Sequence, residues 1–147
     1  SEIAANQQTS VAAMNIDIFP TIVDFAGVSV PREVTLDGKS LRGVLTNNED
    51  SAHEFLYLFN NDRIAAVRSR KWKLVVETFY RTGVPSFDNS NSYYAPYGLL
   101  FDLEKDPAET YSYTREYPGV AEALRSHLIE GQKQFNSRVL PNMFNRL

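Results

Sequence analysis

The sequence predicts an α+β fold, in which a four-stranded antiparallel sheet packs against a C-terminal helix and is preceded by a helical joining segment. Helical periodicity marks residues 16–26, and an amphipathic stripe returns after Pro118. Between them the apolar pattern changes to period 2 over four short runs. Helices and strands that are grouped rather than alternating indicate α+β.

Residues 16–26 are predicted to form a helix with an apolar circumference and one polar line. Asp17, Thr21 and Asp24 make that line, which we expect to face solvent. The Asp17 carboxylate is expected to cap the first turn. Gly27 should end the helix, because a left-handed residue there carries no Cβ penalty.

A second helix of one turn is predicted in the stretch DGKSLRGVL. Asp37-Gly38 reads as a turn, and Ser40 is placed to cap a short helix over residues 41–45. We therefore assign residues 1–50 to a joining segment and residues 51–147 to a subdomain made of the sheet and the last helix.

The period-2 runs are rich in aromatic and β-branched residues and are separated by turn residues. They cover residues 55–59, 64–68, 72–78 and 99–103. The last helix is predicted over residues 119–138, where an apolar stripe recurs at helical spacing and should lie on the sheet.

Composition excludes several classes of function. The net charge of −3 without a basic cluster argues against nucleic-acid binding, which needs concentrated lysine and arginine. No apolar run approaches the roughly 18–20 residues of a membrane span. The chain has no cysteine, so disulfides and thiolate metal sites are not available. Because it begins with Ser1, we expect a processed product or a segment of a longer protein.

No catalytic or metal-binding constellation is predicted within the chain. We interpret His53 as a surface residue in a loop and His127 as a residue at the wet border of the last helix. Two carboxylate pairs are explained better by cap and turn chemistry than by acid-base or metal chemistry. These pairs are Asp17 with Asp24, and Asp102 with Asp106.

Four stretches in register resemble a known family. DIFPTIVDFAGV, LDGKSLRGVL, RIAAVRSRKWKLV and LLFDLEKDPAETY, within residues 16–113, resemble the C-terminal part of sulfatases of the arylsulfatase type, which are alkaline-phosphatase-like hydrolases. After the Asp-Pro turn the family's motif usually runs Glu, two residues, then Asn-Leu. Glu109 fits this motif, whereas Ser112 and Tyr113 stand in place of Asn-Leu. This departure concerns the subfamily rather than the family.

The resemblance implies a parent enzyme that hydrolyses sulfate esters in an upstream catalytic domain. That domain would use formylglycine and calcium, would act on a sulfated small molecule or sugar, and would be the partner of this segment. The chain lacks cysteine and any Ser-x-Pro-x-Arg, so no catalytic position carries over and the segment alone is expected to be inactive. The resemblance favours a periplasmic or extracytoplasmic location; the sequence itself leaves the compartment open.

The long segment 81–97 is the candidate for a contribution to the rim of the substrate pocket. In sulfatases the loops of the C-terminal subdomain can reach that rim, and a loop of this length is usually functional or mobile. Aromatic rings would stack on an aryl or sugar ring, and a guanidinium would meet an anionic group. The candidate residues are Tyr80, which precedes the segment, and Arg81, Phe87, Tyr93 and Tyr94 within it. The alternative interpretation is a surface loop whose tyrosines cover the sheet.

Two other functions remain open from the sequence. A free-standing module could bind carbohydrate or protein through the same aromatic loop. A parent hydrolysing phosphoryl esters would keep the superfamily, and the upstream nucleophile would decide between the two reactions. If the helix over residues 16–26 needs cover from a larger domain, the isolated segment should expose an apolar patch and self-associate.

Overall fold

The computed structural model describes residues 2–50, 52–76 and 98–144, with side chains up to residue 136. The chain divides into two compact units, residues 1–56 and 57–147. The boundary between a joining segment and a sheet subdomain, placed between residues 50 and 51, remains a prediction. No helix in the described parts of the chain has the length and apolar character of a membrane span.

Two short helices and the crossing between them form the first unit. A 3-10 turn, η1 (Asn15–Asp17), leads into α1 (Ile18–Phe25), and α2 (Arg42–Asn47) follows the crossing. Gly27 has φ +66°, and the N–H of Val28 donates to the carbonyl of Val23 at 3.1 Å. Gly27 therefore ends the first helix as predicted.

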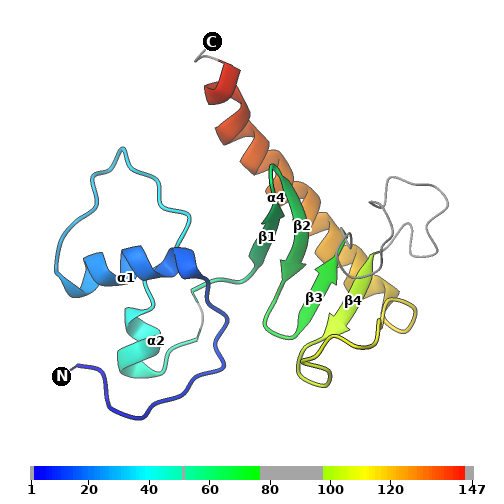
Figure 1. Cartoon of the computed structure of the whole chain (residues 1–147), viewed down its shortest axis with the longest axis horizontal. Helices are drawn as coiled ribbons and strands as arrows, with labels where there is room; N and C mark the ends of the chain where they lie inside the picture. The colour runs from blue at the N-terminus through cyan, green and yellow to red at the C-terminus, as the bar shows by residue number, and fades with distance from the viewer. Residues whose placement is uncertain (1, 51, 77–97, 145–147) are drawn as a thin grey trace. The chain divides into compact units, whose positions relative to one another are not determined.

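The second unit contains the predicted sheet. Its strands are β1 (Leu56–Asn60), β2 (Arg63–Arg68), β3 (Trp72–Val75) and β4 (Leu99–Asp102), and each pairs with the next along the chain (Figure 1). The α+β prediction is confirmed. The third strand is predicted to reach residue 78, but it ends at Val75, and the described residue Val76 is a bend. Residues 77 and 78 lie outside the described part of the chain.

Hydrogen bonds donated by backbone N–H groups hold the turn between β2 and β3 and the outer edge of β4. The β2–β3 hairpin closes where Ser69 N–H donates to the carbonyl of Trp72 at 2.8 Å, as the short turn predicted. At the outer edge of β4, Tyr113 N–H donates to the Leu100 carbonyl at 2.7 Å, and Leu100 N–H donates to Thr114 Oγ1 at 3.0 Å. The segment before the last helix therefore covers this edge.

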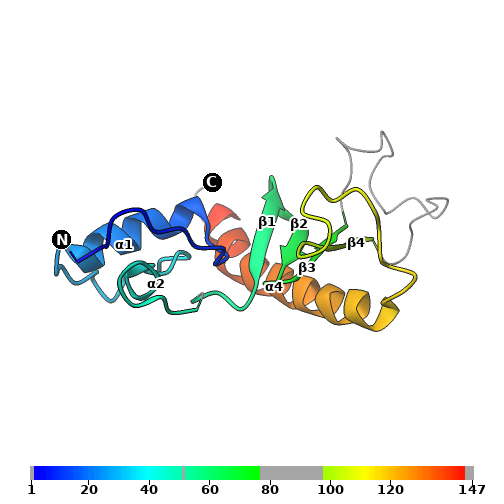
Figure 2. The same cartoon turned by 90° about the horizontal axis from the view of Figure 1, so that it is seen from below.

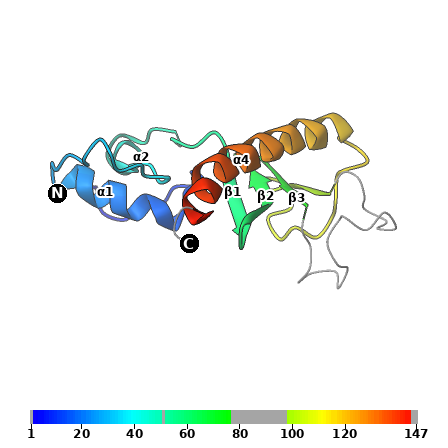
Figure 3. The same ribbon diagram turned by 90° about the horizontal axis from the view of Figure 1, so that it is seen from above.

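The last helix, α4 (Pro118–Phe144), lies along the sheet, as Figures 2 and 3 show from two sides. Ala121, Leu124 and Leu128 are buried, which confirms the predicted stripe. A Cβ on Gly131 would lie 2.8 Å from the Tyr57 ring, so glycine permits the close approach. The helix is longer than the predicted 119–138.

Candidate functional site

The five predicted rim residues cannot be placed. Residues 77–97 lie outside the described part of the chain, and so the proposal that this segment contacts substrate stays a prediction. The residues concerned are Tyr80, Arg81, Phe87, Tyr93 and Tyr94.

The described residues instead bring together a buried polar centre around Asp17, whose carboxylate has no exposed surface. Its Oδ2 accepts the N–H of Met14 at 2.8 Å. Its Oδ1 accepts the N–H of Lys39 at 2.8 Å and lies 2.8 Å from Nε2 of His53. One carboxylate thus joins the chain before α1, the crossing and the segment that leads to the sheet.

The polar line predicted for the helix over residues 16–26, made of Asp17, Thr21 and Asp24, faces the crossing. Its predicted exposure to solvent is therefore wrong for Asp17 and Thr21. Thr21 is 9% exposed, and its Oγ1 accepts the N–H of Leu41 at 2.9 Å. Asp24, which is partly exposed, accepts the hydroxyl of Ser40 at 2.5 Å. These side chains satisfy donors of the crossing that would otherwise be buried without an acceptor.

Neither of the two predicted side-chain caps is present in the structure. Asp17 is wrong as a cap of the helix over residues 16–26: its carboxylate binds the Met14 N–H, on the N-terminal side of the helix. Ser40 is wrong as the cap of the second helix, because α2 begins at Arg42 with Leu41 at its N-cap position and no side-chain cap. Ser40 lies one residue earlier, where its Oγ accepts the N–H of Arg42 at 3.2 Å and donates to Asp24. Gly38 allows the turn to approach, since a Cβ there would be 2.1 Å from the carbonyl oxygen of Ile16.

The electrostatics of this unit favour charged carboxylates. Burial raises the pKa of Asp17, but bonds from the N–H groups of Lys39 and Met14 and from His53 outweigh it and leave the pKa lowered. The hydroxyl of Ser40, followed by Arg42, lowers the pKa of Asp24. Arg42 Nη1 lies 3.3 Å from Asp24 Oδ1, and Nη2 lies 2.8 Å from Oε2 of Glu2.

The interpretation of His53 as a surface residue is wrong. Its side chain is only 8% exposed and pairs with Asp17, which lies 36 positions earlier in the chain. Neither residue carries a local pattern that points to the other, because cap and loop chemistry explains each separately. By contrast, His127 is exposed at the border of α4, as expected.

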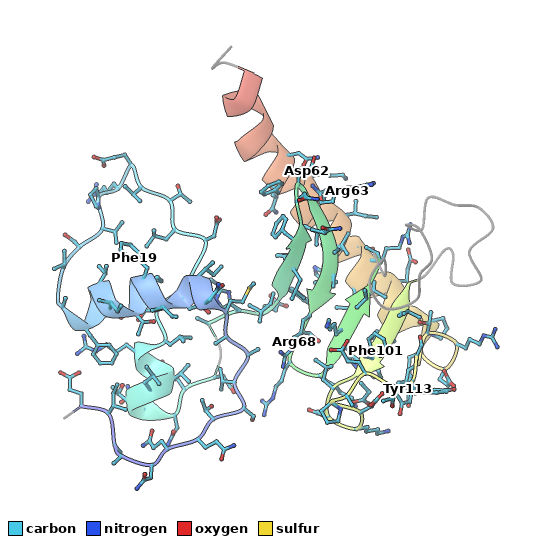
Figure 4. The ribbon with its side chains drawn as sticks, viewed as in Figure 1. Phe19, Asp62, Arg63, Arg68, Phe101 and Tyr113 are labelled. Atoms are coloured by element: carbon cyan, nitrogen blue, oxygen red, sulfur yellow. The ribbon has the colours of Figure 1, made fainter. Side chains whose placement is uncertain are left out.

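The outer face of α1 is apolar and exposed. Ile18 and Phe19 are each 58% exposed and Ile22 is 61% exposed. Figure 4 shows Phe19 on the side of α1 that points away from α2. The unit therefore buries the polar line of its first helix and displays the apolar side chains, which marks this face as a candidate docking surface.

The acidic residues of the second unit serve turns, as predicted. Oδ1 of Asp102 accepts the N–H groups of Glu104 and Lys105, each at 3.2 Å. Oδ2 of Asp106 accepts those of Thr110 and Tyr111 at 2.6 and 2.9 Å. Both carboxylates therefore stabilise the chain between β4 and α4.

The described residues do not fit a calcium site. Nowhere among them do three or more histidine or carboxylate side chains gather to hold a metal ion. Both oxygens of Asp17 already accept hydrogen bonds, so this buried carboxylate is fully used within the fold.

Comparison with known proteins places the chain in a family. Residues 51–146 match the family described as the C-terminal region of aryl-sulfatase. This chain therefore belongs to the family of aryl-sulfatase C-terminal regions.

Individual relatives agree with this assignment. A steryl-sulfatase of Rattus norvegicus is 31% identical over 144 residues, which cover 84% of this chain and 25% of the relative. Arylsulfatase D of Homo sapiens is 34% identical over 112 residues, covering 64% of this chain and 19% of the relative. The chain thus spans a quarter or less of these two relatives, consistent with a C-terminal portion of a larger protein.

A solved structure shares the fold. A protein in complex with its substrate D-glucosamine-2-N,6-O-disulfate matches with a TM-score of 0.61 and 25% identity, over 93% of this chain and 27% of that one.

Proposed function

We propose that the chain supports the catalytic domain of a sulfatase that hydrolyses sulfate esters, and that it docks on this upstream domain through the outer face of α1. The catalytic domain would supply formylglycine, calcium and the residues that bind the sulfate group. The chain itself contributes packing and no catalytic group.

The exposed apolar face of α1 is the observation that supports this proposal. Ile18, Phe19 and Ile22 are each more than half exposed, while the polar line of the same helix is engaged within the unit. Burying a side chain of this kind contributes about 1.5–3 kcal/mol. This free energy is gained when the face packs against an apolar surface of another domain and is not gained while the face stays in water.

The test uses the full-length protein and the isolated chain. Phe19→Ser and Ile22→Ser in the full-length protein should each reduce hydrolysis of para-nitrophenyl sulfate, because the face no longer packs. Val34→Ser is the matched control, since Val34 is 48% exposed and lies outside α1. The isolated chain should be inactive.

Three results would contradict this assignment. One is para-nitrophenyl sulfate hydrolysis by the pure isolated chain, and another is equal losses in all three variants. A full-length protein that cleaves para-nitrophenyl phosphate but not the sulfate would keep the docking role and remove the sulfatase reaction.

The segment 81–97 is proposed to shape the rim of the substrate pocket, on the chemistry of its residues alone. Aromatic side chains at Phe87 and Tyr93 would stack on the alcohol part of the ester, and Arg81 would bind an anionic group. Alanine at these three positions in the full-length enzyme should alter the preference among sulfate esters more than it alters stability. Unchanged kinetics on several esters would exclude the role.

A further inference from the structure

A cluster of four aromatic side chains lies on the second unit, between β3 and the start of α4. We name the side chains of Trp72, Tyr111, Tyr113 and Tyr117 the aromatic platform. The Trp72 ring centroid lies 5.0 Å from that of Tyr117 and 6.3 Å from that of Tyr113, and the centroids of Tyr111 and Tyr113 are 4.9 Å apart. Figure 4 labels Tyr113 on the segment between β4 and α4.

Backbone and ring contacts hold the platform in place. Tyr113 N–H donates to Leu100 of β4, and Tyr111 N–H donates to Oδ2 of Asp106 at 2.9 Å. The rings meet at tilted or edge-to-face angles, which is the favourable arrangement for aromatic pairs. A ligand that stacks on such rings loses little free energy to ordering the protein.

Two of these side chains remain substantially exposed to solvent. Tyr111 is 53% exposed and Tyr117 is 39% exposed. Both rings contact Tyr113, and their exposed parts sum to on the order of 200 Å², taking the roughly 150–250 Å² of an aromatic side chain. A stable protein partner needs about 800 Å² on each side, so the platform is much too small for one. This area suits the face of one or two sugar rings.

Polar groups border the rings. Lys71 Nζ lies 5.1 Å above the centre of the Trp72 ring, and the lysine side chain is 40% exposed. The Tyr111 hydroxyl donates to the carboxylate of Glu116, and this bond raises the pKa of Tyr111. Lys71 lies near two carboxylates, 3.6 Å from Asp102 and 4.0 Å from Glu104, so the cation is already balanced. Such a rim fits hydroxyl groups better than a strongly charged ligand.

We propose that the aromatic platform binds a neutral pyranose ring of a glycan, which stacks on Tyr111 and Tyr117 while its hydroxyls bond to Lys71 and Glu116. This proposal goes beyond the docking and sulfatase roles and depends on neither. It uses residues different from those of segment 81–97.

The test exploits Trp72, which is the only tryptophan among the 147 residues. Cellohexaose is titrated into the 147-residue chain while Trp72 emission is recorded, and glycerol serves as a control for bulk solvent effects. A saturable change at millimolar cellohexaose, absent with glycerol, is expected. Tyr111→Ala and Tyr117→Ala should each weaken binding about three- to tenfold, as the loss of one stacked ring predicts.

Two further variants keep the result interpretable. Tyr111→Phe retains the ring and should bind nearly as the parent chain does. Phe59→Ala removes an aromatic ring that is 47% exposed on β1 and should leave binding unchanged. If Tyr117→Ala fails to fold by far-ultraviolet circular dichroism, Tyr111→Ala decides, since its side chain is mostly exposed. Absence of a saturable change, unaltered binding in Tyr111→Ala, or an equal loss in Phe59→Ala would overturn the proposal.

Discussion

Two amphipathic helices of this chain bury opposite kinds of side chain. In α4 the apolar stripe of Ala121, Leu124 and Leu128 packs within the sheet unit. At α1 the buried residues are polar: Thr21 and Asp17, which directly precedes the helix, are buried against the crossing. An amphipathic pattern therefore shows that a helix has two faces, and the groups that the rest of the chain offers decide which one is covered.

The largest expected effect tests the apolar side of this comparison. Leu124→Ala should lower the free energy of unfolding of the second unit by about 4 kcal/mol, because a side chain that is 4% exposed leaves a cavity. Chemical denaturation followed by Trp72 emission measures it. Ile129→Ala, on the exposed side of the same helix at 45%, is the control and should change the free energy by less than about 0.5 kcal/mol. Equal effects at the two positions would contradict the assignment of faces.

The next effect tests the polar side. Asp17→Ala should destabilise the first unit by about 3 kcal/mol, since it leaves the buried N–H groups of Met14 and Lys39 and the ring of His53 without their acceptor. Amide hydrogen exchange across residues 15–25 reports on this unit specifically. Val34→Ala, at an exposed site of the same unit, is the control. Exchange rates that stay unchanged in Asp17→Ala would show that the polar centre does not hold α1.

Lowering the pH should have a smaller effect on the stability of the first unit. The folded-state pKa of Asp17 is lowered below its usual 3.8, so its contribution is complete above that value and is lost as the pH falls through the folded pKa. Over that window the slope should approach about 1.4 kcal/mol per pH unit for this one group. Hydrogen exchange across residues 15–25 at several pH values measures it, with Asp17→Asn as the comparison. An identical pH dependence in Asp17→Asn would exclude this carboxylate as the cause.

The smallest effect on stability concerns the outer face of α1. Ile22→Gln should change the free energy of unfolding by less than about 0.5 kcal/mol, because Ile22 is 61% exposed. It should reduce any self-association of the isolated chain, which sedimentation velocity measures. Val34→Gln is the matched control for loss of an exposed apolar side chain. If the parent chain self-associates and Ile22→Gln associates to the same extent, the contact between chains does not involve the outer face of α1.

Local patterns in the sequence were sufficient for much of the fold. Alternation of apolar residues located the strands, and the stripe of α4 identified its buried face. The positive φ of Gly27 was predicted because it depends on residues within a few positions. The turn roles of Asp102 and Asp106 were predictable for the same reason.

Only the tertiary structure decided the orientation of α1 and the role of His53. The acceptors Asp17 and Thr21 meet N–H donors about 20 positions later, at Lys39 and Leu41. His53 reaches Asp17 across 36 positions. Sequence spacing on one helix carries no information about such distant donors. The sequence by itself determined where helices and strands form, since periodicity is local. The buried polar centre required three separate segments to converge, because a carboxylate is stable out of water only where enough donors meet it.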